Sequence, residues 1–196
     1  MKPRTLIQEL YHGSPRQGLR ELVPHISTHG QSWLYATRDE VVAALFLGRL
    51  GGDLTCAIGL LNGKPYLRER FPGALDVRYG SVAGSIYVLP AAPFVPSQTA
   101  WEEDWVSPQT VVPLREIRVA NAREHLLQLA REARLSLFYY RDGVSDPAAE
   151  EESLVNTAVR KYARSGEEVL SLIQAYHPRL YGRIRQAIGL EGADTA

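Results

Sequence analysis

Residues 33–47 read Trp-Leu-Tyr-Ala-Thr-Arg-Asp-Glu-Val-Val-Ala-Ala-Leu-Phe-Leu, and they predict a strand that runs directly into a helix. On such a strand Tyr35 points to the face opposite its two apolar neighbours. Thr37 and Glu40 have the spacing of a capping box, which predicts that Thr37 caps a helix over residues 41–47. This stretch therefore combines both kinds of secondary structure.

The composition of the chain changes near Asn121. Ten of the twelve prolines and most short apolar runs precede it, whereas Ala, Leu, Glu, Arg and Gln dominate after it. This predicts an α+β fold with a compact β-rich domain at 1–120 and a helical C-terminal region at 121–196. We expect the helices to pack on that domain, or on a second copy of the chain to form a homodimer.

The expected elements follow from runs of suitable residues bounded by Gly, Pro or polar turns. Strands are expected at Leu10–Gly13, Trp33–Thr37, Leu54–Leu61, Val77–Tyr79, Ser85–Leu89, Val111–Val112 and Glu116–Val119. Later helices are expected at Ala122–Leu135, Ser145–Arg164, Glu167–Tyr176 and Pro178–Ile188, with Pro147 in the first turn of the second.

The bulk composition narrows the classes of partner and compartment. The 196 residues contain 22 basic and 22 acidic side chains, so no net charge attracts nucleic acid or an anionic membrane. Neither is expected as a partner. The only cysteine, Cys56, excludes an internal disulfide and a Cys-rich zinc module. Because no signal peptide or membrane-length apolar run is present, we expect a cytoplasmic protein.

A first cluster of interest is Leu10-Tyr-His-Gly-Ser14. His12 stands on a short predicted strand, and Gly13 has no side chain, so a ligand can approach both the imidazole and the backbone. The alternative is a structural or surface histidine.

Two further clusters contain polar groups beside aromatic ones. Tyr35 either lines a cleft or lies in the core with its hydroxyl paired. Trp101-Glu-Glu-Asp-Trp105 places three acids between two tryptophans. One acid held against an aromatic wall would have a raised pKa, and the alternative is a solvated run.

The order and spacing of the three clusters resemble the His-Tyr-acid branch of the ADP-ribosyltransferase superfamily, including small bacterial enzymes such as rifampin ADP-ribosyltransferases. The matching residues are His12, Tyr35 and one acid among Glu102, Glu103 and Asp104. The likeness covers about residues 8 to 120 and leaves the helical region unexplained. It implies the NAD-binding fold of that superfamily.

The resemblance implies that NAD is a cosubstrate. His12 would then hydrogen-bond a ribose hydroxyl and Tyr35 would stack on the nicotinamide. The remaining residues expected to bind NAD are Gly13, Ser14 and Thr37. The acid would stabilise the positive charge that develops on the ribose as the glycosidic bond loosens.

Among the acids, the resemblance favours Asp104, because it directly precedes Trp105-Val-Ser107, where the acid of the family is expected. Glu103 is the second choice. On an extended segment Asp104 and Glu102 would share one face. The implied activity is ADP-ribosyl transfer or NAD glycohydrolysis, with the acceptor left open among protein, small molecule and water.

Two other functions remain open on the same fold. One is a degenerate module that binds a nucleotide or a partner without catalysis, since a fold alone does not establish chemistry. The other, ranked third, is RNA 2'-phosphotransferase activity, although Arg4, Arg16 and Arg20 show no spacing of a phosphate clamp. No metal site is expected, because Pro24 and Gly30 bracket His25 and His29 and favour a loop.

Overall fold

The computed structural model of the chain describes residues 8–26, 30–48, 52–96, 98–99, 101–144 and 146–190. Strands with short helices are followed by a helical C-terminal region, so the fold is α+β as predicted. The chain divides into two compact units. The first comprises 1–49, 62–65 and 79–136, and the second comprises 50–61, 66–78 and 137–196. The second unit thus includes two segments that precede the change in composition.

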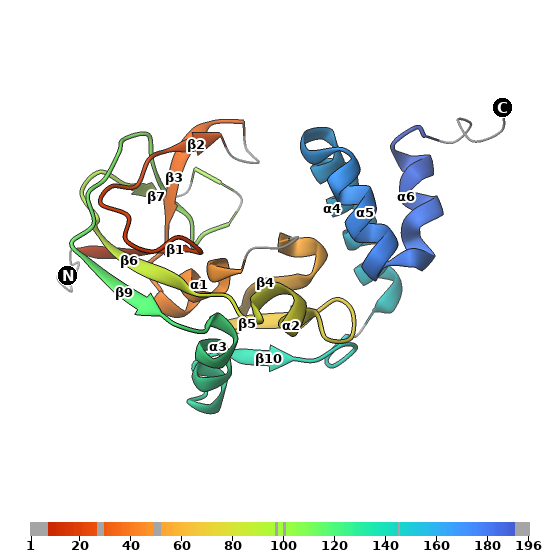
Figure 1. Ribbon diagram of the computed structural model, residues 1–196, viewed down its shortest axis with the longest axis horizontal. Helices are drawn as coiled ribbons and strands as arrows, with labels where there is room; N and C mark the ends of the chain where they lie inside the picture. The colour runs from red at the N-terminus through yellow and green to blue at the C-terminus, as the bar shows by residue number, and fades with distance from the viewer. Residues whose placement is uncertain are drawn as a thin grey trace, which may run out of the picture. The chain divides into compact units, whose positions relative to one another are not determined.

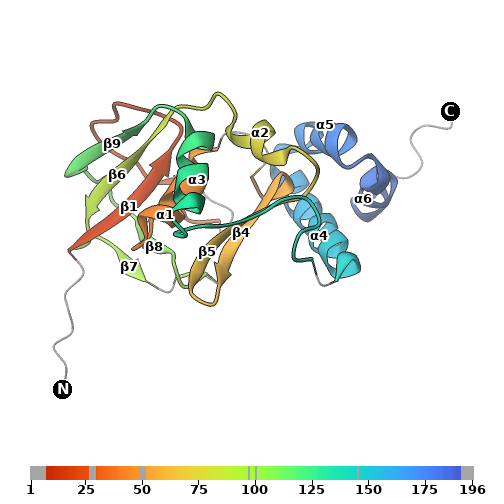
Figure 2. The ribbon, with the colours of Figure 1, turned by 90° about the horizontal axis from the view of Figure 1, so that it is seen from below.

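The first unit contains two antiparallel sheets. In one sheet the order is β1 (Glu9–Ser14), β6 (Gly84–Pro90), β9 (Arg115–Val119), and these strands lie side by side in Figures 1 and 2. In the other the order is β2 (His25–Ile26), β3 (Ser32–Ala36), β8 (Trp105–Ser107), β7 (Val95–Pro96). The central strand β6 is buried except at its last residue, as its apolar and aromatic side chains require.

The two sheets share an apolar core and a backbone connection. The buried members of this core are Leu10, Leu22, Leu34, Ala36, Tyr87, Leu89, Ala91, Phe94 and Val111. The connection joins β1 to the end of β3. There, the Tyr11 N–H donates to the Thr37 carbonyl at 2.7 Å, and the Thr37 N–H donates to the Tyr11 carbonyl at 2.9 Å.

Helix α1 (Glu40–Ala44) packs closely on β1 and continues as the 3-10 turn η1 (Leu45–Leu47). A Cβ atom on Gly13 would lie 1.9 Å from the Ala43 carbonyl oxygen, so only glycine permits this approach. Helix α3 (Ala122–Arg131) completes the first unit. The Asn121 side chain caps it by accepting the Glu124 N–H at 3.1 Å.

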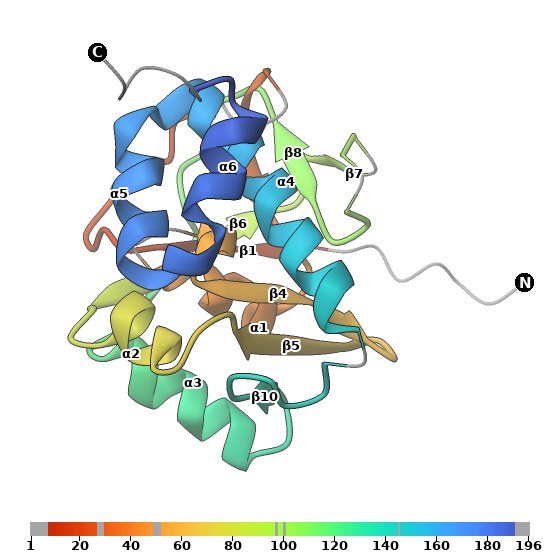
Figure 3. The same cartoon turned by 90° about the vertical axis from the view of Figure 1, so that its right-hand side faces the viewer.

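The second unit combines a small sheet with helices. Its elements are the 3-10 turn η2 (Gly52–Leu54), β4 (Cys56–Leu61), most of β5 (Lys64–Glu69), most of α2 (Ala74–Tyr79), most of β10 (Ser136–Phe138), α4 (Pro147–Ser165), α5 (Glu167–Tyr176), η3 (Pro178–Leu180) and α6 (Tyr181–Ala187). The sheet order is β10-β5-β4. Helices α4, α5 and α6 lie against one another in Figure 3 and bury a core that includes Leu154, Leu170 and Ile184.

Most expected elements are confirmed. The strands around Leu10, Trp33, Ser85 and Glu116 are present, and α5 has the expected bounds. Pro147 occupies the first turn of α4 behind the cap Asp146, while Ser145 lies outside the described residues. The helix expected over 178–188 is present as η3 followed by α6.

Three local predictions are wrong. Val77–Tyr79 is helical, because the Glu69 carboxylate accepts the Leu75 N–H at the start of α2 and overrides the strand propensity of Val77. Val111–Val112 is not a strand, since only Val111 pairs, with Leu22.

The expected cap of α1 is also wrong. Its cap is Asp39, whose carboxylate accepts the Val41 N–H at 2.8 Å. The Thr37 hydroxyl instead accepts the N–H of Asp39 at 3.3 Å.

Within the described residues, no helix combines the length and apolar character needed to cross a membrane.

Candidate functional site

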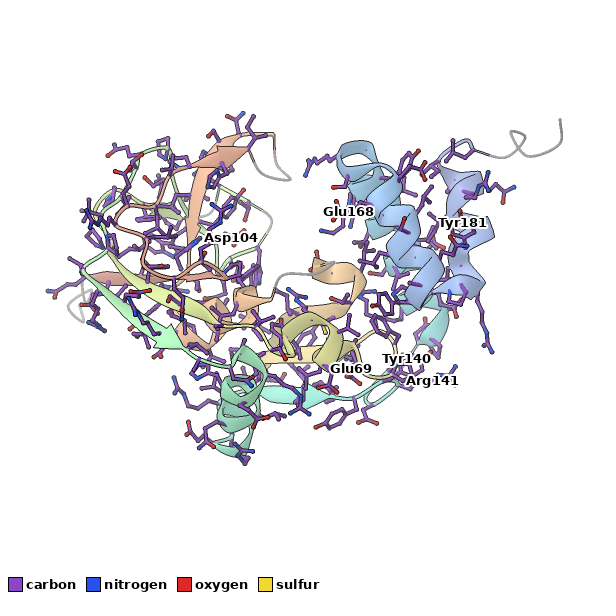
Figure 4. The ribbon with its side chains drawn as sticks, viewed as in Figure 1. Glu69, Asp104, Tyr140, Arg141, Glu168 and Tyr181 are labelled. Carbon is purple, nitrogen blue, oxygen red and sulfur yellow. The ribbon has the colours of Figure 1, made fainter. Side chains whose placement is uncertain are left out.

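The three clusters expected to form a site meet in the first unit. The Tyr11–Thr37 backbone pair joins the first cluster to the second. Strand β3 pairs with β8, with Ala36 opposite Trp105. Thr37 directly follows β3 and Asp104 directly precedes β8, so the antiparallel register brings these two residues to the same end of the pair. Figure 4 marks Asp104 at this place.

His12 is held by the backbone of Tyr35. Its Nδ1 lies 2.7 Å from the Tyr35 carbonyl oxygen, which can only accept a hydrogen bond, so Nδ1 carries the proton. Burial of the ring is the main cause that lowers the pKa of His12, and the nearby His25 lowers it further, while the bond to Tyr35 opposes this. A neutral imidazole with this tautomer has its acceptor lone pair on Nε2.

Nε2 of His12 makes no hydrogen bond with the described part of the chain. The strand pairing and the Nδ1 bond fix the ring, so the acceptor atom has a defined position. A ligand hydroxyl group is the kind of donor that suits it.

Gly13 and Ser14 shape the backbone beside His12. Gly13 provides the room for Ala43 described above. The buried Ser14 hydroxyl accepts the Arg16 N–H at 3.1 Å and so fixes the turn after β1. In the structure, Gly13 contacts Ala43, the Ser14 hydroxyl binds the Arg16 N–H, and the Thr37 hydroxyl binds the Asp39 N–H. All these partners are residues of the chain itself.

Tyr35 lies as the alternation predicted. Leu34 and Ala36 are buried in the core at 3% and 5% exposure, whereas Tyr35 is on the opposite, half-buried face. Trp33 shares this face, and the two rings meet edge to face with centroids 6.2 Å apart. The Tyr35 ring is therefore supported from one side by Trp33 and stays outside the core.

The two acids expected to be catalytic have different partners. The Thr99 hydroxyl donates to Oδ2 of Asp104 at 2.7 Å, which fixes the orientation of that carboxylate. Glu103 instead forms an ion pair with Arg38 at 3.6 Å. The Asp104 N–H donates to the Trp101 carbonyl at 3.0 Å, so this segment is a turn. The extended geometry, in which Asp104 and Glu102 share a face, is therefore wrong.

The structure adds an aromatic pair, Phe46 and Trp101, to the residues expected at the site. Phe46 in η1 is 41% exposed, and its ring centroid lies 6.0 Å from that of Trp101 at an interplanar angle of 50°. The Phe46 Cβ is 3.4 Å from the place a Cβ on Gly13 would take. In the sequence, Phe46 is only the one aromatic residue of the apolar run 41–47, which does not indicate an exposed ring.

Metal chemistry finds no support in the described ranges, which contain no group of three or more potential ligands among His, Cys, Asp and Glu. His25 is exposed in the two-residue strand β2. Its expected loop neighbour His29 lies outside the described residues.

Comparison with known proteins gives no relative from which a function can be transferred. No family model, no curated protein sequence and no solved structure matches the chain. The function is therefore inferred from the geometry around His12, Tyr35 and Asp104.

Proposed function

We propose that the first unit binds NAD and breaks its bond between nicotinamide and ribose, passing ADP-ribose to an acceptor or to water. The observation that carries the proposal is the meeting of the three clusters through the Tyr11–Thr37 backbone pair and the β3–β8 pairing. Segments separated by many residues thus bring an imidazole, aromatic rings and a carboxylate into one region.

The His12 tautomer supports a role in holding the ribose. Its Nδ1–H donates to the Tyr35 carbonyl, so Nε2 accepts, and a ribose hydroxyl is the matching donor. The lowered pKa of His12 keeps this acceptor neutral at neutral pH. A protonated imidazole at this position would repel the positive charge that develops on the sugar during bond cleavage.

The aromatic side chains support a role in binding the nicotinamide. Tyr35 lies on the half-buried face of β3, and Phe46 is partly exposed beside Gly13. Flat rings bind flat ligands by offset stacking or edge contacts, which add about 0.5–1.5 kcal/mol beyond area burial. In the proposal, Tyr35 stacks on the nicotinamide and Phe46 with Trp101 forms a neighbouring wall.

Asp104 supplies the anion in the proposed reaction. The bond from Thr99 fixes the orientation of this carboxylate before the substrate arrives. A preorganised negative charge favours the oxocarbenium-like transition state over the ground state. Glu103, already paired with Arg38, is the weaker candidate.

A second candidate function is a binding module without catalysis. It is favoured by the fact that both acids already have partners in the chain, Thr99 for Asp104 and Arg38 for Glu103. The experiment that separates the two functions measures NAD-dependent stabilisation and nicotinamide release by the whole chain at millimolar NAD. Stabilisation with release supports the enzyme, and stabilisation alone supports a binding module that holds NAD. If NAD causes neither stabilisation nor release, the proposal of NAD cleavage is wrong, and a binding module for another ligand is favoured.

A further inference from the structure

The loop that follows β1 is fixed to the neighbouring strands by a network of hydrogen bonds. The Glu116 carboxylate accepts the Gly18 N–H at 2.8 Å and the Ser85 hydroxyl at 2.6 Å. Gln17 reaches across to the Gly84 carbonyl at 2.8 Å. These contacts join a loop directly after the His12 cluster to the start of β6 and to β9, so the loop has a defined course.

Tyr87 fixes the same loop from inside the core. Its hydroxyl donates to the Arg16 carbonyl at 2.8 Å and accepts the Leu19 N–H at 3.0 Å. Burial is the main cause that raises the pKa of Tyr87, so the hydroxyl stays protonated. The Gly18 N–H and the Ser85 hydroxyl lower the pKa of Glu116 to about 2, so its carboxylate stays charged.

Arg16 is held on both sides of its backbone. Its N–H donates to the Ser14 hydroxyl and its carbonyl accepts from Tyr87. Its side chain is exposed, and its guanidinium has no hydrogen bond or ion pair with the described residues. By contrast, Arg38 and Arg115 of the same unit are paired with Glu103 and Glu9.

We infer that Arg16 is an anion-binding residue of the site, that its ligand group is the diphosphate of a dinucleotide, and that Glu116, Ser85 and Tyr87 are its positioning residues. This inference depends on the proposed function and deepens it. The loop begins three residues after His12, directly after β1, and a guanidinium with free donors suits the oxygens of a phosphate. A fixed backbone reduces the entropy lost when this contact forms.

The test compares ligands with and without the diphosphate. Calorimetric titration of the whole chain gives the Kd of NAD and of nicotinamide for the wild type, Arg16→Gln, Arg16→Lys and Tyr87→Phe. The matched control is Arg115→Gln, which removes an equal charge from β9 and breaks only the ion pair with Glu9.

Arg16→Gln is expected to raise the Kd of NAD on the order of 10-fold and to leave the Kd of nicotinamide unchanged. Added salt should weaken NAD binding less in this variant than in the wild type. Arg16→Lys should recover part of the loss, and Tyr87→Phe should weaken NAD binding selectively. Arg115→Gln should bind both ligands normally.

Three results would overturn the inference while leaving the proposed function standing: an unchanged Kd of NAD in Arg16→Gln, an equal loss for nicotinamide, or the same loss in Arg115→Gln. If the wild type binds neither NAD nor nicotinamide, the proposed function fails and the inference fails with it. The wild-type titration therefore distinguishes the two failures.

Discussion

The surroundings of His12 in the first unit and of His177 in the second contain the same polar contact. In each, one ring nitrogen lies 2.7 Å from a backbone carbonyl: Nδ1 of His12 at Tyr35, and Nε2 of His177 at Leu54. In each, burial is the main cause that lowers the histidine pKa. The polar contact by itself therefore does not distinguish a binding histidine from a structural one.

The aromatic neighbours make the difference. Near His177, Phe71 and Tyr176 stack on each other with centroids 4.6 Å apart and planes at 13°, and Phe71 meets His177 edge to face. The rings of Phe71, Tyr176 and His177 are therefore packed against one another. In the first unit, Phe46 and Trp101 are tilted and farther apart, and Phe46 is exposed. Beside the His12 cluster the Phe46 ring is therefore partly exposed, in contrast to the packed rings around His177. The proposed function assigns this exposed ring to the binding of a flat ligand.

The largest expected effect is on nicotinamide release, when the charge of Asp104 in the first unit is removed. Asp104→Asn keeps the shape of the side chain and its contact with Thr99 but removes the charge. Nicotinamide release should fall on the order of 10²-fold while NAD binding stays nearly intact. Steady-state release assays and calorimetry check this.

Glu103→Gln is the control for that prediction, because Glu103 pairs with Arg38. If Glu103→Gln abolishes release and Asp104→Asn does not, the catalytic acid is Glu103. If neither change matters and release continues, the carboxylate mechanism is wrong.

The next effect separates the two histidines. His177 is 8% exposed, so His177→Ala removes a buried hydrogen bond and ring packing. It should lower the free energy of unfolding by about 2 kcal/mol and leave the Kd of NAD unchanged. His12→Ala should show the opposite pattern, with a smaller loss of stability and weaker NAD binding. Chemical denaturation and titration with NAD of both variants check this. If the two variants lose stability and NAD affinity in the same way, His12 and His177 do not have different roles.

Replacing aromatic rings should have a smaller effect on binding. Phe46→Leu should weaken NAD binding several-fold, corresponding to about 1 kcal/mol, because a flat contact surface is lost. Tyr176→Leu, in the second unit, should lower stability and leave NAD binding unchanged. Equal NAD affinity of Phe46→Leu and the wild type would exclude this ring as a wall of the site.

The smallest effect is a dependence of stability on pH. Burial lowers the pKa of His12, His125 and His177 below the ordinary value of 6.5. The unfolded chain therefore binds protons first, so stability is full above about pH 6.5 and declines as the pH falls toward the folded-state pKa values. The melting temperature should decrease as the pH is lowered from about 7.5 to about 5.5. This decrease should be less steep in His177→Ala than in the wild type. The same slope in both proteins would show that His177 makes no contribution.

Local signals predicted the helical region and part of the site. Proline and acidic residues at the start of α4, and Gly166 before α5, suffice to place those helices. Strand β5 was not predicted, because charged residues and Pro65 obscure it. Its hairpin signal was Asn62-Gly63, where both residues have positive φ.

The remaining features of the site depend on tertiary contacts. His12 and Tyr35 could be proposed from their local motifs. The pairing of Asp104 with Thr99, the wall formed by Phe46 and Trp101, and the support of Arg16 by Tyr87 each require an arrangement that no local pattern encodes.

A crystal structure of the chain with NAD would show whether NAD binds at the first unit with His12 accepting a ribose hydroxyl. We expect the nicotinamide against Tyr35 and a hydroxyl of the adjoining ribose about 2.6–3.2 Å from Nε2 of His12. If NAD binds elsewhere, or is absent from this site at millimolar concentration, the proposed binding mode is wrong.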